Sequence, residues 1–240
     1  EDRFFLDSEK VLPDKIFLND QFAVKQLESA GISGELATVV GNPILEEISI
    51  SVGKLNNFSS LETYEDYLGL KSIVYISEEL ASAFPTDSLD YPGFDEFKVL
   101  TDILDCAPVE KRVIVKLHPE ERQDKYEDVQ HNYGNRELIV VKECNTETLL
   151  ESADFVVGMG SMLLIEAAKT RKDVISYRPN EKMTFIGNQM GVTKLISNRE
   201  ELMAVILGEI EVSNDLVGSR FTGSMKKILS VVNELIQTDH

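Results

Sequence analysis

Residues 153–168, with the sequence ADFVVGMGSMLLIEAA, decide the fold of this chain. Residues 155–157 are apolar on both faces, which is typical of a strand buried between two layers of helices. Gly158 and Gly160 follow the strand, and glycine lets a backbone turn sharply and approach a ligand closely. Ser161 is a good helix N-cap, so its hydroxyl and the first N–H groups of the helix point out of the sheet edge. A helix start of this kind favours an anion such as phosphate.

Glu166 is the unusual residue of the helix that follows, because its neighbours are Met, Leu, Ile and Ala. In one interpretation, this stretch is an ordinary buried strand–helix unit and Glu166 faces solvent. In the other, Ser161 binds a phosphate and Glu166 binds sugar hydroxyls. The stretch by itself leaves both interpretations open.

The composition restricts the classes of protein. The chain has 240 residues, of which 42% are hydrophobic, so it can bury a substantial core. Its net charge of −18 argues against nucleic-acid binding over a broad surface. Cys106 and Cys144 form neither a disulfide framework nor a metal-ligand spacing, which favours a reducing, cytoplasmic compartment. No signal peptide or membrane-spanning run is recognisable, and the start at Glu1 suggests a fragment or a processed chain.

Apolar strands alternate with helical segments along most of the chain, which indicates a parallel, doubly wound sheet. The predicted helices include 44–52 and a charged surface helix at 120–133, and 56–60 is the best linker candidate. In such a sheet, ligands bind beyond the carboxyl ends of the strands. Three unusual groups of residues follow predicted strands and therefore meet at this edge: 118–119, 158–161 and 178–180.

His118 ends a strand and precedes Pro119, whose ring restricts the backbone before it. A histidine in this position can donate a hydrogen bond to a phosphate oxygen and, when protonated, neutralise a departing phosphate. Alternatively, it bonds only to a neighbouring loop. Lys116 faces the same side of the strand, where it adds positive charge to the crevice or covers apolar surface with its stem.

Several other kinds of chemistry lack their motifs. The sequence has no P-loop, and the segment 158–161 lacks the third glycine of a dinucleotide-binding fingerprint. No cluster has zinc-ligand spacing, and the surroundings of Ser161 are not a hydrolase nucleophile elbow.

Taken together, these residues resemble the C-terminal, nucleotide-binding half of GT-B glycosyltransferases. The resemblance is to capsule sialyl- and Kdo-transferases, CDP-glycerol glycerophosphotransferases and the related UDP-N-acetylglucosamine 2-epimerases. It is carried by segments 15–20 and 39–43, by Lys116-Leu117-His118-Pro119, by Gly160-Ser161 with Glu166-Ala167, and by a closing helix at 219–237. It implies a Rossmann-like parallel sheet with helices on both faces. It also implies that residues 1–55 are the tail of an N-terminal Rossmann-like domain and hinge, and that 56–240 form the nucleotide-sugar-binding domain.

The resemblance further implies roles for single residues. His118 would contact the donor phosphate and assist its departure, the turn from Gly158 to Ser161 would bind phosphate, and Glu166 would bind the ribose. Lys116 and Met162 are also expected among the nucleotide- and phosphate-binding residues. Met162 stands where many members have a second hydroxyl residue, a departure that weighs against a CMP-sugar. The expected substrate is a CMP-, CDP- or UDP-linked sugar, without a metal or other cofactor. The expected partners are a glycan acceptor and the missing N-terminal domain in cis or in trans, and the full-length enzyme could associate peripherally with a membrane.

Three functions therefore compete. The first is donor binding in a glycosyltransferase of surface polysaccharide or glycoconjugate biosynthesis. The second is epimerisation of a UDP-sugar, which uses the same fold. The third is a non-catalytic nucleotide-sugar-binding subunit.

Overall fold

The computed structural model describes residues 5–6, 9–43, 46, 72–171, 173–180, 185–214 and 223–238. The chain divides into two units, one formed by Glu1–Asn56 with Gly218–His240 and the other by Asn57–Val217. The predicted linker at 56–60 and most of the predicted helix at 44–52 lie outside the described residues.

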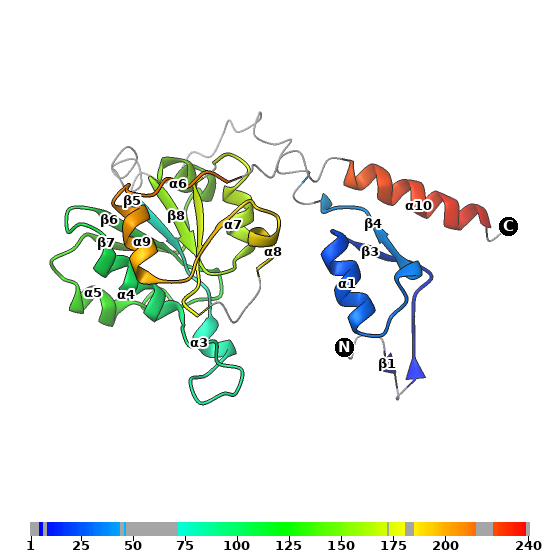
Figure 1. Ribbon diagram of the computed structural model, residues 1–240, viewed down its shortest axis with the longest axis horizontal. Coiled ribbons are helices and arrows are strands. Elements are labelled where there is room, and N and C mark those ends of the chain that lie inside the picture. The colour runs from blue at the N-terminus through cyan, green and yellow to red at the C-terminus, as the bar shows by residue number, and fades with distance from the viewer. Residues whose placement is uncertain are drawn as a thin grey trace. The chain divides into compact units, whose positions relative to one another are not determined.

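The first unit is built around a small parallel strand pair. Strands β3 (Ile16–Leu18) and β4 (Ala37–Val39) are joined through helix α1 (Gln21–Ser29) and the short 3-10 helix η2 (Gly34–Leu36). A second pair, β1 (Phe5–Leu6) and β2 (Glu9–Lys10), is antiparallel. Helix α10 (Ser224–Thr238) also belongs to this unit (Figure 1).

Glu46 connects α10 to the first part of the chain. Its carboxylate accepts hydrogen bonds from the N–H groups of Gly223 at 2.6 Å and Met225 at 3.1 Å. The hydrogen bonds from Met225 and Gly223 lower the pKa of Glu46, because they stabilise its ionised form. The division thus differs at this point from the predicted domain of 56–240, because α10 is held by the first unit.

The second unit is a six-stranded parallel sheet in the order β10-β9-β8-β5-β6-β7. Its strands are β5 (Ser72–Ile76), β6 (Arg112–Lys116), β7 (Leu138–Val141), β8 (Phe155–Gly158), β9 (Val174–Tyr177) and β10 (Lys194–Ile196). Every residue of β5, β6 and β9 is buried, which explains why these strands read as apolar runs rather than as alternating patterns.

Helices cover both faces of this sheet (Figure 1). Helices α4 (Glu96–Cys106), α5 (Glu127–Asn132) and α9 (Arg199–Ile206) contribute apolar side chains to the cluster on the face that carries Ile73 and Tyr75. Helices α6 (Thr146–Ser152) and α7 (Met162–Ala167) contact the sheet at β5 and at β8 and β9. Two short helices, α3 (Leu80–Ala83) and α8 (Ile186–Gln189), also belong to this unit. The predicted Rossmann-like parallel sheet is therefore confirmed.

The predicted charged helix at 120–133 is wrong over its first half. Residues 119–126 form turns, and α5 begins only at Glu127. The physical reason is Glu121, whose side chain is fully buried and bound by groups of the sheet edge instead of facing solvent.

Candidate functional site

The carboxyl ends of β6, β5 and β8 lie in one register across the sheet. Ile76 of β5 pairs with Lys116 of β6 on one side and with Gly158 of β8 on the other. From β5 the chain continues through β6 and β7 on one side, and later returns to β8, β9 and β10 on the other. The edge between β5 and β8 is thus the switch point of the sheet, where ligands of doubly wound folds bind.

Glu78, His118 and Gly160 each lie two residues beyond this register, after β5, β6 and β8. The structure therefore brings His118 and the turn from Gly158 to Ser161 to one edge. Ser176 of β9 pairs with Gly158, so the third predicted group, which begins at Arg178, follows at the same level. Between His118 and the turn, the structure adds a carboxylate that the sequence reading did not single out.

Glu78 binds the turn that was predicted to hold phosphate. Its Oε1 accepts hydrogen bonds from the backbone N–H groups of Gly160 at 2.7 Å and of Met159 at 3.2 Å. Burial raises the pKa of Glu78, and these N–H groups act against that rise. The turn thus binds an anionic group, and in this structure the group is supplied by the chain itself.

Gly158 and Gly160 were expected to allow a sharp backbone turn and a close approach to a ligand, and their surroundings differ from each other. Neither has a left-handed backbone, so the turn does not need glycine for its conformation. A Cβ at Gly158 would lie 3.3 Å from both Cβ and O of Ile76 and 3.2 Å from the side chain of Leu164, so a larger residue at this position would crowd its neighbours. A Cβ at Gly160 would make only ordinary contacts, the shortest of them at 3.6 Å to Phe185.

Ser161 is the N-cap of α7, as predicted. Its Oγ accepts a hydrogen bond from the N–H of Leu163 at 3.2 Å, and the hydroxyl proton remains able to donate to a ligand. Met162 is exposed on the first turn, with 47% of its surface accessible. Glu166 is half-buried, and its charge opposes the lowering of the pKa of Lys169 to about 8, which burial causes.

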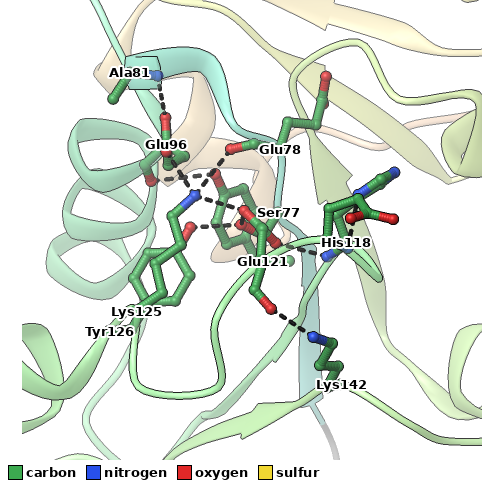
Figure 2. Close-up of polar contacts among 11 residues, drawn as sticks. Ser77, Glu78, Ala81, Glu96, His118, Glu121, Lys125, Tyr126 and Lys142 are labelled. Atoms are coloured by element: carbon green, nitrogen blue, oxygen red, sulfur yellow. Dashed lines mark hydrogen bonds and ion pairs between the residues drawn. The ribbon is translucent and has the colours of Figure 1, made fainter. Parts of the chain in front are cut away.

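His118 is exposed, and its orientation is set by two neighbours. Its Nδ1 accepts a hydrogen bond from the N–H of Glu120 at 3.3 Å. A neutral imidazole bonded in this way carries its proton on Nε2, so Nε2–H is the donor that a ligand can use. The backbone N–H of His118 donates to Oε2 of Glu121 at 2.6 Å (Figure 2).

Lys116 is buried, with 7% of its surface accessible. Its Nζ donates to the carbonyl oxygens of Leu117 at 2.7 Å and Lys142 at 2.9 Å. The ammonium group is therefore bound by backbone at the ends of β6 and β7, an arrangement that neither of the two sequence interpretations described. Arg178, at the end of β9, is also buried, and its guanidinium donates to Oδ1 of Asn188 at 2.6 Å.

A buried polar network lies beneath the loop of His118 (Figure 2). Nζ of Lys125 pairs with Glu121 at 2.5 Å and with Glu96 at 2.6 Å. Ser77, which directly follows β5, donates to Glu121 at 2.7 Å, and its Oγ lies 2.6 Å from the hydroxyl of Tyr126. The sequence reading missed this network; the i, i+4 spacing of Glu121 and Lys125 was the one signal that could have indicated it.

Within the described ranges, no group of three or more His, Cys, Asp and Glu residues is arranged to hold a metal ion. No helix among the described residues has the length and apolar character needed to cross a membrane.

Comparisons with known proteins find likeness in structure but not in sequence. No protein-family model matches the chain, and no curated protein matches it significantly. The UDP-GlcNAc 2-epimerase of Methanocaldococcus jannaschii, in complex with UDP-GlcNAc and UDP, is 14% identical, with a TM-score of 0.65 over 92% of this chain and 61% of that chain. MnaA of S. aureus, in a structure with UDP, is 16% identical, with a TM-score of 0.62 over 94% of this chain and 60% of that one.

At these identities the likeness shows the fold. It confirms the predicted resemblance to the fold of the UDP-GlcNAc 2-epimerases. The chain spans about three fifths of the length of these two structures.

Proposed function

We propose that this chain binds the nucleoside diphosphate of an activated sugar at the carboxyl edge of β5, β6 and β8, as the donor-binding part of a GT-B-type enzyme. The observation that carries the proposal is the common register of Ile76, Lys116 and Gly158, after which an imidazole and an anion-binding turn follow on strands that flank β5. Imidazole, hydroxyl and backbone N–H donors at a switch point suit a phosphate.

Each group has a definite role in this proposal. Nε2–H of His118 donates to the phosphate nearest the sugar, and a protonated imidazole neutralises the charge that develops as the nucleotide leaves. The hydroxyl of Ser161 and the N–H groups of the turn bind the other phosphate. Glu166 accepts from ribose hydroxyls. Lys116 supports the edge from below, because its ammonium group is bound to backbone carbonyls.

The proposed reaction is transfer from the nucleotide donor to a glycan acceptor, with a second Rossmann-like domain in cis or in trans completing the site. Epimerisation of a UDP-sugar is the second candidate. It is favoured by Glu78, a carboxylate with a raised pKa at the same edge as His118, because moving a proton to and from carbon requires acid–base groups. Assays of the full-length protein for nucleotide release and for UDP-sugar interconversion distinguish the two reactions.

Nucleotide binding is tested by calorimetric titration of UDP, CDP and CMP into the chain. We expect UDP or CDP to bind and to raise Tm, because a ligand of the folded state stabilises it. His118→Ala and Ser161→Ala should each weaken binding by about tenfold, as expected for the loss of one hydrogen bond to a charged ligand. His131→Ala removes an exposed histidine of α5 and is the control. Normal binding by both site variants would place the ligand elsewhere.

A further inference from the structure

Glu121 holds both backbone polar groups of His118. Its Oε2 accepts the N–H of His118 at 2.6 Å, and its own N–H donates to the carbonyl oxygen of His118 at 3.0 Å. The side chain of Glu121 is fully buried, with 0% of its surface accessible. The loop is therefore fixed by a carboxylate beneath it, on the side away from solvent.

The same carboxylate joins this loop to the neighbouring strand. Oε1 of Glu121 accepts from Oγ of Ser77, the first residue after β5, and from Nζ of Lys125. Both oxygens of the carboxylate thus face donors only. Because Ser77 directly follows β5, the position of His118 relative to β5 depends on this side chain (Figure 2).

We propose that Glu121 is the positioning residue for His118: it sets where the imidazole stands at the sheet edge and so how well the imidazole reaches a bound phosphate. The consequence for binding rests on the proposed function, whereas the positioning itself does not. Glu121 touches no ligand in this proposal and acts only through His118.

The alternative is that Glu121 is merely part of a stabilising ion network. Glu96 provides a matched control for that alternative, because it is also buried and also pairs with Lys125. Its other oxygen accepts the backbone N–H of Ala81 at 2.7 Å, in a part of the chain that does not include His118. The two carboxylates differ in which backbone N–H they hold and in the hydroxyl of Ser77, which donates to Glu121 alone of the two.

Replacement by glutamine creates the same conflict at both positions. Each carboxylate receives donors on both oxygens, so in either orientation the new NH₂ group of Glu121→Gln or Glu96→Gln faces a donor. Both substitutions also leave Lys125 with one buried carboxylate partner instead of two. We therefore expect similar losses of Tm.

The experiment compares E121Q and E96Q in the wild-type and the His118→Ala backgrounds. The NMR resonance of the His118 imidazole is assigned by its loss in His118→Ala, and UDP affinity is measured by calorimetry. We expect only E121Q to shift that resonance and to weaken UDP binding, by about tenfold, the scale of one hydrogen bond to a charged group. E121Q should add nothing in the His118→Ala background, where there is no imidazole to position.

The opposite results would overturn the proposal: equal effects of E121Q and E96Q on the imidazole and on affinity, further weakening by E121Q in the absence of His118, or loss of the fold in E121Q alone. If both variants unfold, the comparison is made in trimethylamine N-oxide, which strengthens burial. If UDP does not bind the wild-type chain, the proposed function fails, and the imidazole resonance alone then decides the positioning: an unshifted resonance in E121Q refutes it.

Discussion

Glu78 and a phosphate would compete for the same backbone donors, and this makes the effect of Glu78→Ala on nucleotide binding predictable. In the structure, the carboxylate accepts the N–H groups of Gly160 at 2.7 Å and Met159 at 3.2 Å. A phosphate that uses this turn must first displace it. Removal of the carboxylate should therefore tighten binding, whereas removal of a phosphate ligand would weaken it.

The size of the effect follows from these contacts. A hydrogen bond to a charged group contributes about 1.5–3 kcal/mol, and only one of the two contacts is short. The displaced carboxylate also regains water, which offsets part of the loss because burial already disfavours its ionised form. We therefore expect a net gain of about 1.4 kcal/mol, or about tenfold in Kd for UDP.

The assay is calorimetric titration of UDP at constant ionic strength, with Glu79→Ala as the control. Glu79 is the next residue in the chain, is exposed and carries the same charge, whereas the N–H groups of Met159 and Gly160 bond to Glu78. Its removal therefore reports the general effect of one negative charge. An affinity of Glu78→Ala for UDP that is equal to or lower than that of Glu79→Ala would refute displacement. It would indicate instead that Glu78 stays in place and supports the turn.

Gly158→Ala should lower the free energy of unfolding, measured by urea denaturation, by about 2 kcal/mol, because the new Cβ would crowd the backbone of Ile76. Gly160→Ala is the control and should leave the free energy of unfolding unchanged. Equal stabilities of the two variants would contradict the packing role of Gly158. Lys169→Met should stabilise the fold at pH 7 by about 1 kcal/mol, a value reduced for the solvated part of the side chain. The pKa of Lys169 falls from 10.5 to about 8 in the fold, so the cost of its charge is complete below pH 8 and disappears as the pH rises to 10.5. The difference in Tm between the variant and the wild type should therefore disappear between pH 8 and pH 10.5. A difference that stays constant over this range would refute the lowered pKa of Lys169. Tyr126→Phe should lower the free energy of unfolding by about 1 kcal/mol, because the hydroxyl contact with Ser77 is lost. A urea midpoint equal to that of the wild type would contradict this prediction.

The fold could be predicted from the sequence because its central strands are buried on both faces. Segments such as 73–76 and 174–177 consist almost entirely of apolar residues, and the structure buries all of them. The strand–helix alternation then limited the topology to a parallel, doubly wound sheet. The helix predicted at 120–133 is wrong over its first half for a related reason. Charged residues are usually exposed, yet Glu121 is buried because donors from Ser77 and the His118 loop bind its carboxylate.

The position of the candidate site could also be predicted, because strand ends can be recognised from the local sequence. His118 and Ser161 were placed at one edge from their positions after apolar runs, and register was not needed for that step. Glu78 could not be found in this way. It is followed by another glutamate, and nothing in the local pattern separates the carboxylate that reaches Gly160, 82 residues further along the chain, from the exposed Glu79.

The acidic composition of the chain has a more specific meaning once these contacts are known. Three ammonium groups near the edge are already engaged, Lys116 by two carbonyl oxygens, Lys125 by two carboxylates and Lys142 by the carbonyl oxygen of Glu121. Attraction of a diphosphate by these side-chain cations is therefore a weak basis for binding, and a net charge of −18 opposes it. Backbone N–H groups and the Nε2–H of a neutral His118 are uncharged donors, so they need no counter-charge when no ligand is bound. They hydrogen-bond to a phosphate only at short range. Recognition in the proposed site thus depends on how rigidly these donors are held, which is why the buried network beneath the edge is as relevant to function as the residues on its surface.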